Sequence, residues 1–459
     1  MIDKPFIKLL TYKNKEYFVY DVNKNEVKHI SRETYSDLQS RTCERINSNN
    51  DIAILQFQGY LSSDRPTSIE QALTPYLPVY MNTRVSGIVL QVTQNCNLKC
   101  KYCSYAMNGL YNRTHSVQHM SWDIAKRAID FLKKHSGDLQ NIRISFYGGE
   151  PMLNMQLIKK VVLYAEEIMP YKNINFAMTT NLTLFSKELL DFFVDHDFRI
   201  TVSLDGPQKF NDKNRFFAIN GESSYDTVMG NLKIIASNPD YLQSNIQINA
   251  VVDKSADPQE ILNFFQQHDI LKNVPVELST VNDSNLKIQY YTSSDYLKRG
   301  KINAFKSMLA KAYDISIEDD VLDDIYEKIT KKSAPYSKLK QVHHNGPCIP
   351  GIKKLFVNVA GNFFPCEKAN EMSTHLKIGD IYSDFDGDKI KLIYNIGKIS
   401  EEECINCWAI KLCSSCAVNI DDGTKISKEL KKSRCIAQKK QLENEAIQLG
   451  LISLFQQLP

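Results

Sequence analysis

The sequence predicts an α/β protein whose central part is a parallel sheet wound with helices, either a partial (β/α)6 barrel or an open sheet. Six strand-like segments alternate with segments of helical periodicity between residues 87 and 281. Uninterrupted strand–helix units favour parallel strands joined by right-handed crossovers. Polar and glycine-containing motifs follow several of these strands, at the carboxyl ends where such folds bind ligands.

Local patterns place the elements of this central part. Ser121 is expected to cap a helix with an apolar face, and Asp257 is expected to cap another that begins with Pro258. The six strands are expected at residues 87–93, 142–147, 174–180, 198–204, 245–252 and 274–281.

The first 82 residues read as a small α+β module. Strand-like segments at residues 6–10, 16–20 and 26–30 precede a helix that Ser31 is expected to cap. This order resembles a small winged-helix module that binds peptides. The alternative is an N-terminal extension that packs on the main domain.

The length of 459 residues predicts roughly three domains, at about 150 residues each. After the N-terminal module, the expected divisions are 83–290 for the wound sheet and 291–345 for a helical linker. A cysteine-rich domain is expected at 346–440 and a C-terminal helix at 441–459, within a charged helical stretch at 425–451.

Composition excludes several classes of protein. A hydrophobic fraction of 43% and a charged fraction of 24% exclude wholesale disorder. A net charge of +3 argues against nucleic acid as a partner. The chain has no apolar run near 18 residues and no apolar stretch at its start, so we expect no membrane partner and a cytoplasmic location.

The 11 cysteines are clustered. Three lie at Cys96, Cys100 and Cys103, and Cys43 stands alone as a structural thiol. The other seven lie late in the chain, at Cys348, Cys366, Cys404, Cys407, Cys413, Cys416 and Cys435. Clustered cysteines in a reducing compartment favour metal binding over disulfides.

The early trio directly follows the first expected strand, as Cys96-Asn-Leu-Lys-Cys100-Lys-Tyr-Cys103. Structural zinc usually takes four ligands, often as two distant pairs. A lone trio fits a four-iron cluster in which one iron is left open, and an open iron can bind a substrate or cofactor.

This motif resembles the signature of the radical S-adenosylmethionine (SAM) enzymes, in which an aromatic residue, here Tyr102, precedes the third cysteine. The resemblance implies a partial (β/α)6 barrel in which the open iron chelates SAM. It also implies a low-potential electron donor, flavodoxin- or ferredoxin-like, whose electron cleaves SAM to a 5′-deoxyadenosyl radical. The protein supplies positioning and solvent exclusion for this radical.

Further motifs at the strand ends match the same family. By resemblance, the Gly-Gly-Glu-Pro loop binds the SAM amino group, for which glycines allow close approach and a carboxylate suits an ammonium. Leu182 stands where the family often has a glycine, and Asp205 suits a ribose or an electrostatic role. The expected SAM-binding residues are Gly148, Gly149, Glu150, Pro151, Thr180, Asn181, Ser203, Asp205 and Arg215.

The late cysteines resemble the SPASM domain, the auxiliary iron–sulfur extension of radical SAM peptide and protein modifiers. Two residues rather than the usual three separate Cys413 from Cys416. The resemblance implies three four-iron clusters in all. The distal auxiliary cluster would use Cys404, Cys407, Cys413 and Cys435, and the proximal one Cys348, Cys366 and Cys416. Candidates for the eighth auxiliary ligand are His343, His344, another oxygen or nitrogen ligand, water and a cysteine thiolate of a substrate.

Together these motifs resemble maturases of ribosomally made peptides, of the thioether-forming sactipeptide or ranthipeptide type. The expected partner is a precursor peptide with a leader segment, which the N-terminal module would bind by strand addition. Alternatives are cyclophane formation and sulfatase maturation, for which Glu277 and Asp283 are the candidate acid–base residues. A zinc-stabilised binding protein without turnover is the non-enzymatic alternative.

Overall fold

The computed structural model describes residues 4–40, 49–103, 105, 113–253, 256–281 and 340–455. Cys43 and Asp283 lie outside these residues, as does most of the expected linker at 291–345. Within the described part of the chain, no helix is both long and apolar enough to cross a membrane.

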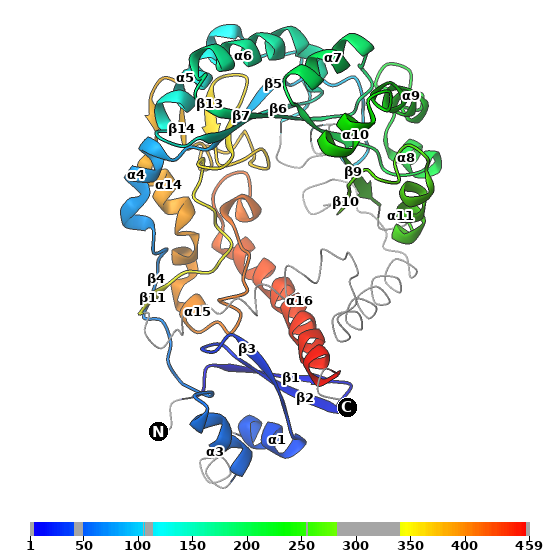
Figure 1. Cartoon of the computed structure of the whole chain (residues 1–459). Coiled ribbons are helices and arrows are strands. Elements are labelled where there is room, and N and C mark those ends of the chain that lie inside the picture. Colours follow the sequence, from blue (N-terminus) through cyan, green and yellow to red (C-terminus); the bar gives the residue numbers. More distant parts are fainter. Residues whose placement is uncertain are drawn as a thin grey trace.

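A partial barrel of six parallel strands lies in the upper part of the view in Figure 1. These strands are β5 (Gly87–Thr93), β6 (Asn141–Gly148), β7 (Asn173–Thr180), β8 (Arg199–Ser203), β9 (Ile246–Val252) and β10 (Val276–Thr280). They lie side by side in chain order and pair in parallel throughout. The expected strands and the radical SAM type of α/β fold are therefore confirmed.

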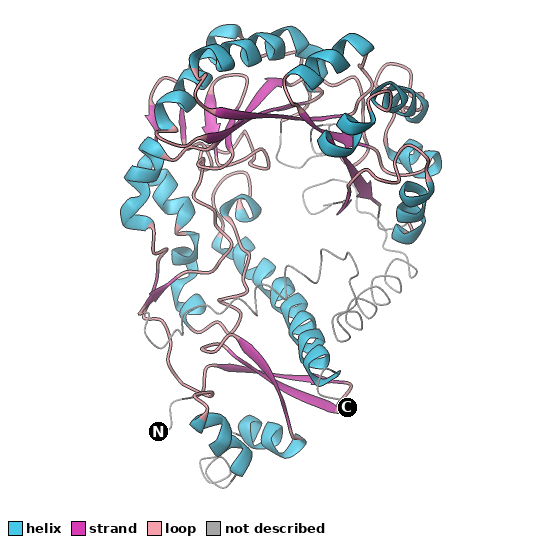
Figure 2. Cartoon of the chain, viewed as in Figure 1, coloured by secondary structure: helices cyan, strands magenta, loops and turns pink. Residues whose placement is uncertain are grey.

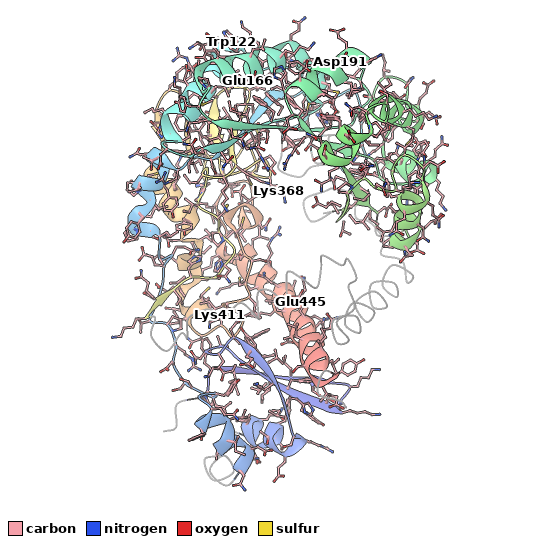
Figure 3. All side chains as sticks on the ribbon, in the orientation of Figure 1. Trp122, Glu166, Asp191, Lys368, Lys411 and Glu445 are labelled. Atoms are coloured by element: carbon pink, nitrogen blue, oxygen red, sulfur yellow. The ribbon has the colours of Figure 1, made fainter. Side chains whose placement is uncertain are left out.

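Helices cover the outer face of this sheet (Figure 2). They are η3 (Pro151–Asn154), α5 (Trp122–His135), α6 (Met155–Ile168), α7 (Lys187–Asp195), α8 (Gln208–Asn214), α9 (Tyr225–Ile235), α10 (Pro239–Asn245) and α11 (Pro258–Gln267). Ser121 caps α5 by accepting from the Ile124 backbone N–H, and Asp257 caps α11 in the same way. Trp122, Glu166 and Asp191 mark the outer helices in Figure 3.

Residue alternation along the strands separates the two faces. On β6, Ile142, Ile144 and Phe146 are buried against the helices in the main hydrophobic core. Arg143, Ser145 and Tyr147 therefore point toward the concave face. Lys368, in the C-terminal region, lies on this inner side of the molecule (Figure 3).

The C-terminal region extends the barrel sheet. Its strands are β11 (Gln341–Val342), β12 (Leu355–Val357), β13 (Asn362–Phe364), β14 (Gly379–Asp380) and β15 (Asp384–Phe385). β12 pairs in parallel with β5, and β13 to β15 continue from it as antiparallel strands. The result is a mixed sheet of ten strands, which covers the edge of β5.

Short helices alternate with the loops that hold most of the late cysteines. They are α14 (Gly387–Tyr394), η5 (Ile396–Ser400), α15 (Glu401–Ile405) and η6 (Ala417–Ile420), followed by the long α16 (Lys428–Phe455). The division expected at residue 440 falls inside α16, which continues through it unbroken.

The N-terminal strands and the helix after them form as predicted. The elements are β1 (Ile7–Tyr12), β2 (Glu16–Asp21), β3 (Glu26–Ile30), α1 (Arg32–Ser40) and α3 (Asn50–Phe57). The three strands make an antiparallel sheet in chain order. A connecting segment with β4 (Ser68–Ile69), η1 (Thr74–Tyr76) and α4 (Leu77–Thr83) leads to the barrel, and β4 pairs with β11.

The N-terminal sheet shares a core with the C-terminal region. One side packs on α1 and α3, around Val19, Leu38 and Ile52. Phe18 and Tyr20 instead share a core with α16 and with the loop after α15. Figure 1 shows α16 running beside this sheet. The N-terminal module is thus joined to the cysteine-rich region by apolar packing.

A buried lysine bonds across this junction, although burial of its charge destabilises the folded protein. Lys411 donates from Nζ to the Asn23 carbonyl, 3.2 Å away, at the boundary marked in Figure 3. Burial lowers the pKa of Lys411 to about 8, although the nearby Asp21 opposes this shift. The folded protein therefore releases this proton more readily than the unfolded chain does.

We expect Lys411→Met to reveal this cost in the pH dependence of stability. Between pH 8 and about 10.4, Lys411 is mostly neutral in the folded protein but still protonated in the unfolded chain. The free energy of unfolding of the wild type therefore rises with pH relative to that of the variant, by about 2–3 kcal/mol over this range. Urea unfolding of both proteins at several pH values measures this difference. A difference that stays constant from pH 7 to 10.5 contradicts the prediction.

Candidate active site

A cavity of about 280 Å³ opens at the carboxyl ends of β5 to β8. We call it the upper cavity. It is lined by Cys96, Leu98, Cys100, Tyr102, Cys103, Tyr105, His115, Tyr147, Gly148, Gly149, Glu150, Thr179, Thr180, Asn181, Ser203 and Arg215. The structure thus brings together the early cysteine trio and all the expected SAM contacts except Pro151 and Asp205.

The early cysteines lie in the loop that follows β5. Burial raises the pKa of Cys96 strongly and that of Cys100 to about 12, and the neighbouring thiols of the trio add to both shifts. His115 bonds the Gln94 carbonyl through Nδ1 and lies 3.7 Å from Cys103 Sγ through Nε2. No feature of the sequence identified His115. The Cys96 and Cys100 thiols are therefore neutral until a metal displaces their protons.

The glycine pair after β6 allows two loops to touch. A Cβ atom at Gly149 would lie 2.1 Å from the Asn95 carbonyl oxygen and 3.0 Å from Cys96 Cβ. At Gly148, where φ is +154°, it would lie 2.1 Å from the Thr93 oxygen. Any side chain here would push the Gly-Gly-Glu-Pro loop away from the cysteine loop.

Glu150 joins the ends of β6 and β7. Its carboxylate is 1% exposed and accepts from Thr180 Oγ1 at 2.6 Å, from the Asn181 backbone N–H at 2.7 Å and from the Met152 backbone N–H at 3.0 Å. Burial raises the pKa of this carboxyl, and the three hydrogen bonds oppose the shift. Glu150 therefore holds the loop in shape, and any bond to a SAM ammonium would be additional.

Leu182 explains the departure from the Thr-Asn-Gly pattern. Its φ is +54°, a left-handed conformation that glycine adopts without strain. Its side chain is fully buried in the main core. Packing of the leucine therefore offsets the backbone strain, and Asn181 remains in place with Nδ2 2.9 Å from Asn97 Oδ1.

Asp205 and Arg215 form a buried ion pair behind the upper cavity. Arg215 Nε donates to Asp205 Oδ1 at 3.0 Å, and Tyr102 donates to Oδ2 at 2.7 Å. The Val251 backbone N–H also donates to Oδ1. Asp205 is 1% exposed and does not line the cavity, whereas Arg215 does. Asp205 thus orients the guanidinium and the aromatic residue of the cysteine motif.

Removing Asp205 is expected to leave the Arg215 charge buried without its partner. Asp205→Ala should lower the free energy of unfolding by about 3–5 kcal/mol, measured in urea. Glu222→Ala is the matched control, because Glu222 is exposed and its loss should change stability by no more than about 0.5 kcal/mol. Equal stability of the two variants would show that the pair contributes little.

The late cysteines interact in two separate groups. Burial raises the pKa of Cys366 to about 11, and the Cys416 and Cys348 thiols add to this shift. Burial likewise raises the pKa of Cys413 to about 12, helped by Cys435 and Cys407. Cys407 is affected in turn by Cys404 and Cys435. We call Cys348, Cys366 and Cys416 the second trio, and Cys404, Cys407, Cys413 and Cys435 the quartet.

The geometry suits clusters with several irons. All ten described cysteines are free thiols. Among the described residues, no three His, Cys, Asp or Glu side chains converge on a single-ion site. A four-iron cluster binds each thiolate through a different iron, so its ligands surround it rather than meet at one point. Three half-buried thiols that line an open cavity fit such a cluster with one iron left free for a ligand.

A second cavity, of about 210 Å³, lies on the concave face of the sheet. We call it the lower cavity. Tyr147 and Thr179 line both cavities, so the two adjoin. Glu367, which follows Cys366, also lines the lower cavity, and its Oε2 is buried without a hydrogen-bond partner among the described residues. Burial raises the pKa of Tyr147, and the charge of Glu367 adds to this shift.

A buried ion pair lies near Tyr147. Arg113 Nε donates to Glu371 Oε1 at 2.8 Å, and Gln91 donates to the same oxygen at 2.6 Å. Both Arg113 and Glu371 affect the pKa of Tyr147. Sequence reasoning found none of these carboxylates, because they lie far along the chain from the barrel motifs. Their closeness to Cys366 was the available signal.

Glu277 lies elsewhere. It is exposed on β10, bonds Gln247 and lines neither cavity.

The two candidate histidine ligands differ in their hydrogen bonds. His343 uses both ring nitrogens inside the protein, since Nε2 accepts from the Gly397 backbone N–H and Nδ1 contacts Gln71 and the His344 carbonyl. The ring nitrogens of His344 are buried without a hydrogen-bond partner among the described residues.

Comparison with known proteins agrees with the site. Residues 90–246 match the Radical SAM superfamily. A protein of Methanocaldococcus jannaschii is 35% identical over 31% of this chain and 46% of its own length. The cysteine-type anaerobic sulfatase-maturating enzyme of Clostridium novyi is 25% identical over 72% of this chain and 87% of its own.

The radical SAM cyclopropyl synthase TigE of Paramaledivibacter caminithermalis is 20% identical over 90% of this chain and 82% of its own length. The solved structure of native anSMEcpe with bound AdoMet superposes with a TM-score of 0.58, at 18% identity, over 81% of this chain and all of that one. This likeness supports the fold. By its motifs, fold and relatives, the chain contains a radical SAM domain at residues 90–246 and is similar to anaerobic sulfatase-maturating enzymes and to a radical SAM cyclopropyl synthase.

Proposed function

We propose that this enzyme is a peptide maturase that installs a crosslink, a cysteine thioether, in a ribosomally made precursor. The observation that carries the proposal is the division of ten cysteines into a trio, a second trio and a quartet. Each of the two trios would leave one iron of its cluster without a protein thiolate. One open iron would bind SAM and the other a substrate thiolate, which suits a reaction that joins a carbon to a sulfur.

The first trio would hold the SAM-binding four-iron cluster that the radical SAM domain implies. SAM itself would occupy the upper cavity, against the Gly148–Gly149 backbone and within reach of Arg215 and Ser203. When bound there and reduced by a flavodoxin- or ferredoxin-like donor, the cluster and SAM would supply a 5′-deoxyadenosyl radical that removes a hydrogen atom from the substrate. The protein's part is to exclude water and to hold the substrate carbon near the cavity.

The quartet would hold a distal auxiliary cluster and the second trio a proximal one. His343 has both ring nitrogens bonded within the protein, and His344 interacts with Lys431 beside the quartet. Neither imidazole is therefore our choice as the eighth ligand. We assign that position to a cysteine thiolate of the substrate, which would lie close to Glu367.

Glu367 is our candidate proton acceptor. It lines the lower cavity next to the second trio. Among the described residues, its Oε2 is buried without a hydrogen-bond partner and its one ion-pair partner is Lys354, at 3.5 Å. Forming a carbon–sulfur bond from C–H and S–H releases one hydrogen atom to the radical, and one proton and one electron besides. Glu367 is placed to accept the proton, and an auxiliary cluster is the expected electron acceptor.

The N-terminal sheet is our candidate for binding the leader segment. Its outer strands β1 and β3 each have one edge without a neighbouring strand among the described residues, and an extended peptide can add to such an edge. Because this sheet shares a core with α16, a bound leader would be held close to the quartet.

The expected location of the enzyme is the cytoplasm. Free thiols and oxidisable clusters suit this reducing compartment.

The test is anaerobic incubation of the reconstituted enzyme with SAM, dithionite and the peptides encoded beside its gene. A thioether removes two hydrogen atoms from the peptide and makes one cysteine resistant to alkylation. A product of the same mass whose cysteine still alkylates indicates a carbon–carbon crosslink and contradicts the thioether.

The relative from Clostridium novyi, matched over 87% of its length, favours sulfatase maturation as the second candidate. A sulfatase-derived cysteine peptide would then yield an aldehyde that a hydrazide traps. Metal analysis separates both from a zinc-stabilised binding protein, since three four-iron clusters require on the order of twelve irons per chain.

A further inference from the structure

A buried lysine lies against the quartet. Lys431, on α16, is 1% exposed. Its Nζ lies 3.3 Å from Cys404 Sγ and also donates to Ser400 Oγ. The same α16 carries Cys435 four residues later, so both side chains lie on one face of the helix.

No described carboxylate neutralises this ammonium. Within the described part of the chain, Lys431 has no Asp or Glu oxygen within 4.0 Å, whereas the exposed Lys428 and Lys432 on the same helix both pair with Glu403. An unpaired charge buried in a protein is costly, and proteins ordinarily provide a counter-charge. A negative group at the quartet would supply the counter-charge that the described carboxylates do not.

The other polar groups around it carry no negative charge. Burial, the His343 ring and Lys431 itself lower the pKa of His344 to about 2, so His344 is a neutral imidazole. Burial also lowers the pKa of His343. Among the described residues, Lys431 also contacts Ser400 Oγ and the Cys404 thiol, and it acts electrostatically on Cys413.

Charge arithmetic identifies the missing group. A four-iron cluster core of charge +2 with four thiolates carries a net charge of −2, and one-electron reduction makes it −3. We propose that Lys431 is the built-in counter-charge of the quartet cluster and that it raises the reduction potential of that cluster by stabilising the added electron. This inference rests on the cluster assignment in the proposed function and adds a residue that tunes it.

The test is a redox titration followed by electron paramagnetic resonance. All proteins carry Cys96→Ala, Cys100→Ala and Cys103→Ala, so that only auxiliary clusters contribute. Lys431→Met should make reduction of one auxiliary cluster at least about tenfold less favourable, a shift of about 59 mV to more negative potential. Lys431→Arg, which keeps the charge, and the surface control Lys432→Met should leave it near the value of the parent protein.

Iron content and the unfolding midpoint are measured in parallel. An unchanged potential in a Lys431→Met protein with full iron overturns the proposal. If that variant does not fold, Lys431→Gln gives the same readout, because it keeps the hydrogen-bond donors without the charge. Loss of the cluster in the neutral variants but not in Lys431→Arg supports the proposal, and loss in all three overturns it. A parent protein without auxiliary iron overturns the cluster assignment itself, which is a separate result.

Discussion

Replacing Cys96, Cys100 and Cys103 together by alanine is expected to reduce 5′-deoxyadenosine formation to background. The three thiols line the upper cavity beside the glycine loop, so their loss would remove the three ligands proposed for the SAM-binding cluster. Anaerobic incubation with SAM and dithionite, followed by chromatography, measures the product.

The matched control removes the second trio instead, through Cys348→Ala, Cys366→Ala and Cys416→Ala. These thiols form a group of their own, so SAM cleavage should persist while peptide modification stops. Undiminished deoxyadenosine in the first variant contradicts the assignment of the SAM site. Persistent peptide modification in the control removes the second trio from the mechanism.

Replacing Glu367 by glutamine is expected to lower peptide modification about 10²–10⁴-fold while SAM is still cleaved. The amide has nearly the same shape as the carboxylate but cannot accept the proton that the substrate cysteine loses. Deoxyadenosine without modified peptide, measured in the same reaction by mass spectrometry, is the expected result.

Glu277→Gln is the control for Glu367. Glu277 is exposed on β10 and outside both cavities, so its replacement should change modification little. A large loss in Glu277→Gln together with an active Glu367→Gln would return the acid–base role to the sixth barrel strand, where sequence reasoning had looked for it.

Local sequence was sufficient for the elements of the barrel. The apolar run of β5 is continuous in sequence, and the cap residues Ser121 and Asp257 bond backbone N–H groups two or three residues later. Such local signals can be recognised without knowing the rest of the fold. For that reason each strand was predicted to within two residues at either end. The choice between a barrel-like and an open sheet was left to the structure, which places the six strands side by side in chain order.

Contacts between distant segments could not be predicted in this way. The pairing of β12 with β5 joins residues more than 260 positions apart, and β12 is only three residues long. The core shared by Phe18 and α16 likewise joins the two ends of the chain. Apolar periodicity shows that a face is buried but not what buries it.

The sequence by itself determined the chemistry of this protein, because a thiol trio at fixed spacing and a glycine–carboxylate loop act over a few residues. Tertiary structure alone decided which carboxylate reaches the cavity and where the Lys431 ammonium is buried. Those outcomes depend on distances between side chains far apart in the chain, and only the packing of the folded molecule sets such distances.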